Sequence, residues 1–387
     1  FAIQLLEGQA PGTRPRIWGL PTRRSRNGAR GGQPTGVGPA LALFFSAVHH
    51  GVMAPRALIH PALTALFLVS PAVPARANDG AALIAPMSGT FEALGRDMRR
   101  SATAILGDDL PVIDDRCEPE PAAAAARDTI VAGDRLVIGL PCIDAFDAAM
   151  PLLAEAAIPV LAVGVRAPDI TTAPRDHDDA WPVFRVGPRM GDEVEALAAY
   201  VAVNWRDEAF AVIDDGTLYG RELSEDIRLL LADRALEPVF VDTYRPLLEN
   251  QTPLVRRLQR SGATHVIIGG DARDAAVIAR SARRIGYDLT LAGGSILIAP
   301  PDDGRLPDGT VIAAMPYDLD LAAMAARIAR QALGADLPVI EALRVLTFAT
   351  AAGPLSFDAT GEPDLDFVRI HTVRDGRPQP VSQNGDG

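Results

Sequence analysis

Short apolar runs alternate with amphipathic stretches over most of the chain. The apolar runs have the length of strands, and the stretches between them repeat apolar residues at helical spacing. The predicted strands are 82–85, 136–138, 160–163, 210–213, 239–241, 265–268 and 289–291. The predicted helices are 91–105, 145–156, 194–203, 223–231, 253–260 and 272–285. Strands that alternate with helices of this length predict βαβ units and parallel sheets.

Polar or glycine-containing turns follow these predicted strands. They are residues 86–89, 141–144, 164–166, 214–220, 269–271 and 293–295. Open parallel sheets bind ligands beyond the carboxyl ends of their strands, and glycine allows the backbone to approach a ligand closely. One such turn is a weak signal, but the whole set predicts a binding cleft at these strand ends.

The charged residues exclude several functions. The chain contains no lysine, so it has neither a Walker-A lysine for a nucleotide phosphate nor a lysine for a Schiff base. Its 37 basic residues against 49 acidic ones give a net charge of −12, which disfavours nucleic acid as a partner. Dinucleotide-binding, zinc-protease and nucleophile-elbow motifs are missing from the sequence. We therefore expect no cofactor, no metal and no catalytic residues.

The first 77 residues differ from the rest. Residues 1–52 carry six arginines and one acid without regular periodicity, and we expect upstream sequence or a disordered basic segment there. Residues 53–77 combine a short basic start, an apolar run of less than membrane-spanning length and the small-residue site Ala75-Arg76-Ala77. These features predict a signal peptide that is cleaved near Ala77.

The two cysteines fall in the predicted exported part. Cys117 and Cys142 are the only cysteines of the chain, and an even pair in an oxidising compartment indicates a disulfide. The alternative is that Cys142, which follows a predicted strand, is a nucleophile. No histidine lies near Cys142 in the sequence, and the disulfide is favoured.

Several of the turns resemble those of one protein family. The segments that carry the resemblance are 86–89 with 95–97, 114–119, 137–142, 167–171, 214–220 and 353–361. The last of these reads Gly-Pro-Leu-Ser-Phe-Asp-Ala-Thr-Gly, and the segment 137–142 keeps the family's cysteine separation. In their joint order, these motifs resemble the type I periplasmic solute-binding proteins of ABC transporters, in the leucine/isoleucine/valine-binding branch.

The resemblance implies a fold of two α/β lobes, each a parallel sheet flanked by helices, joined by three passages of the chain. We expect lobe 1 to comprise 78–185 and 317–350, lobe 2 to comprise 186–316 and 351–377, and a C-terminal tail at 378–387. The passages are expected near 184–187, 310–316 and 351–355. Such lobes close over a solute by bending at these passages.

The resemblance also implies a function. The chain would be the periplasmic substrate-binding component of an ABC importer, a monomer that delivers a small carboxylate-bearing solute to permease subunits in the inner membrane. The solute would be an amino acid or a related compound. Two alternatives stay open: a ligand-sensing protein of the same fold that acts on a receptor or regulator, and an enzyme that depends on Cys142.

The predicted ligand-binding residues are Ser88, Asp144, Gly164, Arg166, Tyr219, Asp271 and Ser295. Several depart from the family pattern. Arg166 stands where relatives have a hydroxyl, Asp144 replaces one of two serines, and Ser295 stands where relatives have an acid. We expect Arg166 to bind a carboxylate, Asp271 to receive a cationic or hydroxyl group, and Tyr219 to form an apolar wall. Alternatively, Arg166 pairs with Asp144 or is solvated, and Asp271 only caps the following helix.

Overall fold

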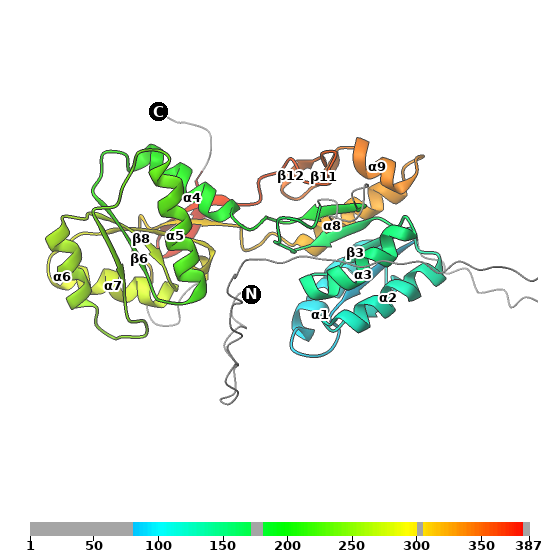
Figure 1. The fold of residues 1–387 in the computed structure, drawn as a ribbon, viewed down its shortest axis with the longest axis horizontal. Coiled ribbons are helices and arrows are strands. Elements are labelled where there is room, and N and C mark those ends of the chain that lie inside the picture. The colour runs from blue at the N-terminus through cyan, green and yellow to red at the C-terminus, as the bar shows by residue number, and fades with distance from the viewer. Residues whose placement is uncertain (1–79, 172–180, 300–304, 382–387) are drawn as a thin grey trace, which may run out of the picture. The chain divides into compact units, whose positions relative to one another are not determined.

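The computed structural model describes residues 80–171, 181–299 and 305–381 (Figure 1). The predicted segments 1–52 and 53–77 lie outside these residues. The described chain forms two main sheets, each flanked by helices, which confirms the predicted fold class. No helix within the described ranges is both long and apolar enough to cross a membrane.

Lobe 1 is built on a parallel sheet with the strand order β2-β1-β3-β4-β5. Its strands are β1 (Ala81–Ala85), β2 (Val112–Asp114), β3 (Leu136–Gly139), β4 (Val160–Val163) and β5 (Val183–Val186). Its helices are α1 (Glu92–Leu106), α2 (Pro119–Ala132), α3 (Ile143–Glu155), α8 (Leu321–Leu333) and α9 (Val339–Val345).

Both faces of the lobe 1 sheet are covered by helices. Successive side chains of a strand point to opposite faces. Leu83 accordingly packs in the core formed with α1 and α8, whereas Ile84 packs in the core formed with α2 and α3. A strand that is buried on both sides is apolar at every position, which explains the continuous runs in the sequence.

Lobe 2 has a seven-stranded sheet with the order β14-β13-β10-β9-β8-β6-β7. Its strands are β6 (Phe210–Asp214), β7 (Phe240–Thr243), β8 (His265–Gly269), β9 (Thr290–Gly293), β10 (Val311–Ala314), β13 (Arg369–Arg374) and β14 (Arg377–Pro380). Its helices are α4 (Asp192–Asn204), α5 (Leu218–Ala232), α6 (Thr252–Ser261) and α7 (Ala272–Arg284), with a short 3₁₀ turn η1 (Ser295–Ile298). Helices α4 and α5 cover one face, and α6 and α7 the other.

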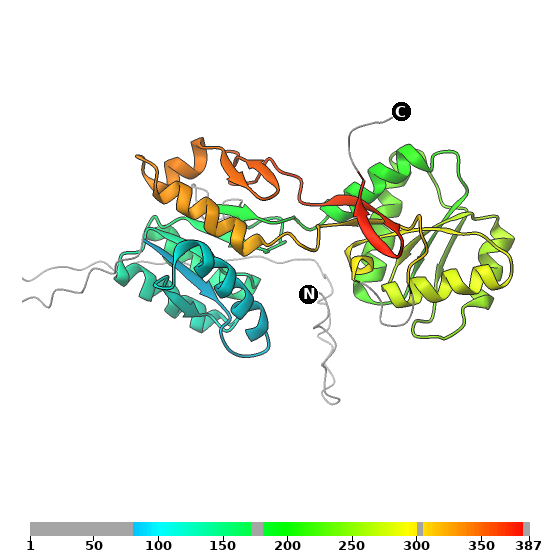
Figure 2. The ribbon, with the colours of Figure 1, turned by 180° about the vertical axis from the view of Figure 1, so that it is seen from behind.

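The C-terminal boundary of lobe 2 differs from the prediction. Residues 378–380 belong to β14, which pairs with β13 in an antiparallel hairpin and is not part of a free tail (Figure 2). Strand β13 is also antiparallel to β10, so this edge of the sheet is mixed. The Asp375-Gly376 turn, with both residues at positive φ, closes the hairpin.

The third passage between the lobes was also predicted too early. The expected segment 351–355 forms instead the second half of a hairpin between β11 (Phe348–Thr350) and β12 (Gly353–Leu355). Leu355, Phe357 and Phe367 all pack in the lobe 1 core, and Val368 is the first residue to pack in lobe 2. Lobe 1 therefore extends to about Phe367, because these side chains need its apolar core.

Candidate functional site

All of the predicted ligand-binding residues follow the carboxyl end of a strand. Ser88 follows β1, Asp144 lies in the first turn of α3 after β3, and Gly164 and Arg166 follow β4. In lobe 2, Tyr219 lies in the first turn of α5 after β6, Asp271 follows β8, and Ser295 follows β9. Their environments differ, and these environments decide what each can do.

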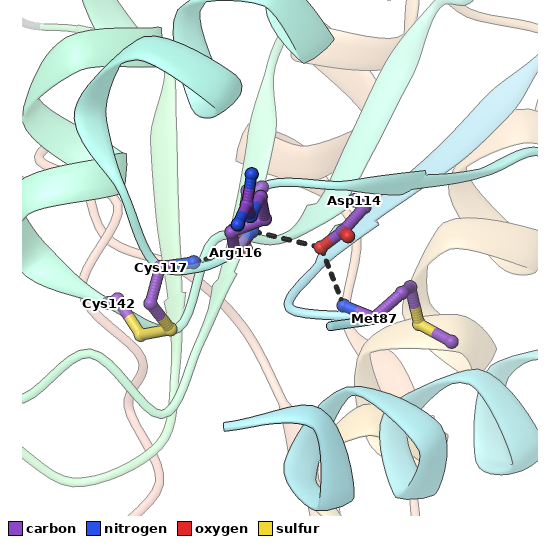
Figure 3. The surroundings of a disulfide bond; sticks show 6 residues. Met87, Asp114, Arg116, Cys117 and Cys142 are labelled. Atoms are coloured by element: carbon purple, nitrogen blue, oxygen red, sulfur yellow. Dashed lines mark hydrogen bonds between the residues drawn. A yellow bond between two sulfur atoms is a disulfide. The ribbon is translucent and has the colours of Figure 1, made fainter. Parts of the chain in front are cut away.

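A disulfide joins two loops at this edge of lobe 1 (Figure 3). Cys117 lies between β2 and α2, Cys142 immediately precedes α3, and their Cα atoms are 5.3 Å apart. The predicted disulfide is confirmed, and both described cysteines are bonded. Because the Cys142 sulfur is bonded to Cys117, Cys142 has no thiol with which to act as the nucleophile of the alternative hypothesis.

Asp114 connects the loops that follow β1 and β2. Its carboxylate accepts hydrogen bonds from the backbone N–H groups of Met87 (2.8 Å) and Arg116 (2.9 Å), as Figure 3 shows. The Ser88 hydroxyl donates to the other oxygen at 2.5 Å. Burial acts to raise the pKa of Asp114, but these hydrogen bonds outweigh it and hold the pKa below its ordinary value. Since its proton is engaged, the Ser88 hydroxyl oxygen can only accept a further hydrogen bond.

The neighbouring Asp115 is a buried acid with a structural contact. Its side chain is fully buried, and Oδ1 accepts from the backbone N–H of Cys117 at 3.0 Å. Burial raises the pKa of Asp115 to about 6, and the charge of Asp114 acts in the same direction. The second oxygen has no hydrogen-bond partner in the part of the chain that the structure describes.

Arg166 contacts an acid that the sequence analysis did not single out. Its Nη2 lies 3.8 Å from Oε2 of Glu193, whose side chain is only 5% exposed. The other oxygen of Glu193 accepts a hydrogen bond from the Tyr219 hydroxyl at 2.5 Å. The alternative pairing of Arg166 with Asp144 is not what the structure has. We call Arg166, Glu193, Tyr219, Gly294 and Ser295 the Glu193 cluster.

Gly294 and Ser295 complete the Glu193 cluster at the end of β9. A Cβ atom at position 294 would lie 1.9 Å from Oε1 of Glu193 and 2.3 Å from the Tyr219 oxygen, so only glycine fits. Burial raises the pKa of Tyr219, as does the charge of Glu193, while the Ser295 hydroxyl acts in the opposite direction. The phenol therefore stays protonated and donates to Glu193.

One polar atom of the Glu193 cluster is buried without a partner. Within the described ranges, Nε of Arg166 has no hydrogen-bond partner, whereas the Ser295 hydroxyl interacts with the Tyr219 hydroxyl. Buried polar groups in folded proteins are almost always satisfied, and exceptions are informative because leaving a group unpaired costs about 1–3 kcal/mol. An unsatisfied guanidinium N–H group beside a buried carboxylate is a candidate contact for another molecule.

The loop that carries Arg166 is held by a buried arginine. Arg185 is fully buried in β5 and donates to the carbonyl oxygens of Val165 (2.6 Å) and Ala167 (2.9 Å) on either side of Arg166. Its guanidinium also pairs with Glu362 at 3.0 Å. Because every face of Arg185 is engaged, it fixes the backbone of the loop and leaves the Arg166 side chain to the Glu193 cluster.

Asp271 caps a helix. Its Oδ1 accepts from the backbone N–H of Asp274 at 2.8 Å at the start of α7, as the alternative interpretation predicted. Asp274 in turn accepts from the backbone N–H of Leu247 at 2.9 Å. Burial, followed by the charge of Asp271, raises the pKa of Asp274 to about 6. Tyr244, beside these acids, is buried with a hydroxyl that has no partner within the described ranges.

Asp144 and Gly164 are the most exposed of the predicted residues. Gly164 has φ +75° and donates its N–H to the Val186 carbonyl, which fits a turn that needs glycine. No described hydrogen bond or ion pair joins Asp144 or Gly164 to the Glu193 cluster. The described residues contain no group of acids, cysteines and histidines arranged to hold a metal ion.

A cavity of about 440 Å³ lies away from the predicted residues. Its lining includes Gly187, Arg189, Glu362 and Phe367 and none of the predicted ligand-binding residues. Two charged pairs involve its wall: Arg189 pairs with Asp192, and Glu362 pairs with Arg185.

Glu193 carried a signal that the sequence analysis passed over. Three acids begin the predicted helix near residue 194, which is ordinarily explained by the helix dipole. Glu193, however, is followed at i+4 and i+8 by Leu197 and Val201, which are fully buried. An acid on the same helical face as two core residues points inward, and this spacing could have identified it.

Comparisons with known proteins agree with this architecture. The profile of the family described as "Periplasmic binding protein" matches residues 81–342, more than half of the chain. The Leu/Ile/Val-binding protein homolog 3 of Brucella melitensis is 26% identical over 224 residues, a match that covers 55% of this chain and 60% of that protein.

Two solved structures share the fold. A substrate-binding protein of an ABC transporter from Desulfitobacterium hafniense, in complex with leucine, has a TM-score of 0.54 and 20% identity over 78% of this chain and 99% of its own. A solute-binding protein from Rhodopseudomonas palustris, in complex with 3,4-dihydroxybenzoic acid, has a TM-score of 0.52 and 15% identity over 78% and 95%. The chain therefore belongs to the periplasmic binding protein family, as a type I protein of the Leu/Ile/Val-binding branch.

Proposed function

We propose that the protein is the periplasmic substrate-binding component of an ABC importer and that its solute carries a carboxylate bound by Arg166. Family membership supports the transport role. The observation that carries the choice of solute is the state of Arg166: its only described side-chain partner is Glu193 at 3.8 Å, and its Nε is buried without a partner.

A guanidinium in this state suits a carboxylate. Arginine presents its N–H groups in a planar fork that binds both oxygens of a carboxylate, and such charge-assisted hydrogen bonds are stronger than neutral ones. A carboxylate oxygen on Nε would satisfy the buried group that now lacks a partner. The side chain of Arg166 is about one-third exposed, so a solute can reach it.

We expect the remaining predicted residues to contribute to solute binding to different degrees. Tyr219 and Ser295 belong to the Glu193 cluster and would line the solute. Ser88 would accept a hydrogen bond, because its own proton is given to Asp114. Asp271 keeps one oxygen free of its capping contact, and Asp144 and Gly164 are exposed at the strand ends. We infer secondary contacts for these last three.

The role requires no chemistry at the site. A solute that contacts both lobes favours the conformation in which the lobes are closed over it. Permease subunits in the inner membrane would recognise that conformation. The acidic composition supports a small-molecule partner and not a nucleic acid. We expect an exported monomer that works without a cofactor.

A thermal-shift panel tests the proposal. The panel contains L-amino acids, the 2-hydroxy acids with the same side chains, benzoates, and amines that lack a carboxylate. A compound at 100 times its Kd stabilises the folded protein by about 2.7 kcal/mol, which raises Tm measurably. We expect stabilisation only by compounds with a carboxylate. Stabilisation only by amines, or by none of the compounds, would contradict the proposal.

A further inference from the structure

A segment near the C-terminus is docked against the edge strand of the lobe 1 sheet. Strand β5 ends that sheet, and the backbone N–H of Arg185 within it donates to the carbonyl oxygen of Gly361 at 2.9 Å. Gly361 has φ +90°, and a Cβ atom there would lie 1.9 Å from the Val183 carbonyl oxygen, so only glycine fits. This close approach places the next side chain, Glu362, beside the guanidinium of Arg185.

Glu362 supplies negative charge to the buried Arg185. The guanidinium is fully buried, and its Nε and Nη2 each lie 3.0 Å from the Glu362 carboxylate. Thr171, which is 2% exposed, donates its hydroxyl to the same carboxylate at 2.6 Å. A buried charge is strongly unfavourable unless it is paired. The position of Arg185 therefore depends on Glu362, and the orientation of Glu362 depends in turn on Thr171.

The remaining contacts of Arg185 reach the loop that carries Arg166. Nη1 donates to the carbonyl oxygen of Val165 at 2.6 Å, and Nη2 donates to that of Ala167 at 2.9 Å. The carbonyl oxygen of Arg166 itself accepts from the backbone N–H of Met190 at 2.7 Å. Three consecutive carbonyl groups of the loop are thus engaged, and Arg185 holds two of them. The backbone that carries the Arg166 side chain is fixed only as firmly as Arg185 is.

We propose that Glu362 and Thr171 are positioning residues for solute binding, which act through Arg185 on the backbone of Arg166. This inference rests on the proposed function, in which Arg166 binds a carboxylate. A guanidinium makes two parallel hydrogen bonds to a carboxylate only when supporting residues hold it close to the productive position and orientation. Loss of this support should lower the affinity for every carboxylate that Arg166 binds and leave their order of preference unchanged.

A double-mutant cycle of Glu362→Gln and Arg166→Ala tests the proposal. Calorimetry gives the Kd of L-leucine or, if L-leucine does not raise Tm, of the carboxylate in the thermal-shift panel that raises Tm most. Glu362→Gln should weaken binding about three- to thirtyfold. In the Arg166→Ala background, the same change should alter Kd by less than about twofold, because Glu362 then has no binding group to position. A purely structural role would lower Tm in both backgrounds without this difference in affinity.

Thr171 provides a second test in case Glu362→Gln does not fold. Thr171→Val keeps the branched shape of the side chain but removes the hydroxyl that orients Glu362, whereas Thr171→Ser keeps the hydroxyl. We expect Thr171→Val to weaken binding at least about threefold and Thr171→Ser to stay within about twofold of wild type. Asp366→Asn, which removes an exposed acid of the segment that carries Glu362, is the matched control and should bind as wild type does.

The outcomes separate this inference from the function on which it rests. Equal affinities of wild type and folded Glu362→Gln overturn the inference, as do equal losses in the presence and absence of Arg166, and both results leave a carboxylate-binding protein. If Glu362→Gln does not fold, equal binding by Thr171→Val and Thr171→Ser overturns it. Failure of every carboxylate to bind, or unchanged binding by Arg166→Ala, contradicts the proposed function itself and removes the inference with it.

Discussion

The two sheet edges that carry the predicted residues use their polar side chains differently. At the edge of lobe 1, a disulfide, Asp114 and the buried Arg185 tie the loops to one another and to the core. At the edge of lobe 2, Asp214 at the end of β6 and Asp271 after β8 each accept a backbone N–H of the turn that follows. In the Glu193 cluster, by contrast, Nε of Arg166 is buried without a partner among the described residues.

This difference teaches how to separate structural from binding residues. A side-chain oxygen that accepts a hydrogen bond from a backbone N–H group stabilises its loop, whatever the charge of the side chain. A buried polar atom without a partner, on a side chain that solvent can reach, is a candidate for contact with a ligand. Changes in the first group should alter stability and spare solute preference, whereas changes in the Glu193 cluster should alter solute affinity. The following predictions test that separation, from the largest effect to the smallest.

The largest expected effect is loss of the disulfide. Replacing Cys117 and Cys142 together by serine removes a crosslink with a sequence separation of 25 residues. The loop-entropy model gives a loss of about 3 kcal/mol in the free energy of unfolding, with solute preference unchanged. Thermal unfolding with and without reductant measures it. An identical Tm under both conditions would show that the disulfide contributes nothing to stability.

Gly294→Ala would disturb the packing of the Glu193 cluster. The added Cβ would lie 1.9 Å from Glu193 Oε1, so the carboxylate must move or the strand end must shift. Overpacking of this kind costs about 1–3 kcal/mol, and we expect solute affinity to fall with it. Calorimetry and thermal unfolding of the same variant give both quantities. Unchanged affinity would show that the position of the Glu193 carboxylate does not matter for solute binding.

Asp274 should give a pH dependence of stability without a change in binding. Its pKa is raised to about 6 in the folded protein, above the ordinary value of 3.8. The folded state therefore holds its proton when the unfolded state has lost it, and the free energy of unfolding decreases as pH rises from about 4 to about 6.

Asp274→Asn removes this contribution. Relative to wild type, the variant should gain on the order of 1–2 kcal/mol of stability between pH 4 and pH 7, because one pKa unit corresponds to about 1.4 kcal/mol and solvent reduces the effect. Denaturant titrations at several pH values measure the difference. A constant difference across this range would refute the raised pKa.

Asp271→Ala should show the smallest effect of this series. Loss of the N-cap of α7 costs about 1 kcal/mol of stability, and Asp271→Asn, which keeps a capping oxygen, should lose less. Solute affinity should stay within a few fold in both variants, since the Asp271 carboxylate is engaged in capping α7. A tenfold or larger loss of affinity in Asp271→Asn would restore the ligand role that the sequence suggested.

Most of the fold could be predicted because strands buried on both faces leave continuous apolar runs. The predicted helix 272–285 and the observed α7 differ by one residue, and the disulfide followed from cysteine number and export. The third passage was misplaced because the apolar residues of 351–367 follow no regular spacing, and only the tertiary packing of Leu355 and Phe367 assigns the segment to lobe 1. The short edge strand β14 could not be predicted either, because its sequence Arg-Pro-Gln-Pro contains no apolar alternation.

The candidate site was predictable only in part. Strand ends identified the region and most of its residues, because topology alone brings them to one edge of a sheet. Glu193 was not predicted because an acid at the start of a helix is ordinarily explained by the helix dipole. The cap at Asp271 and the engaged proton of Ser88 depend on hydrogen bonds that no spacing reveals.

The most direct test of the proposed function is the affinity of Arg166→Ala for the carboxylate compound that stabilises the wild-type protein best. Loss of a charge-assisted hydrogen bond should weaken binding by about 1.5–3 kcal/mol, or roughly ten- to a hundredfold in Kd. Arg283→Ala, at an exposed position of α7, should bind as wild type does. If folded Arg166→Ala binds that compound as tightly as wild type, Arg166 does not hold the carboxylate and the account is wrong.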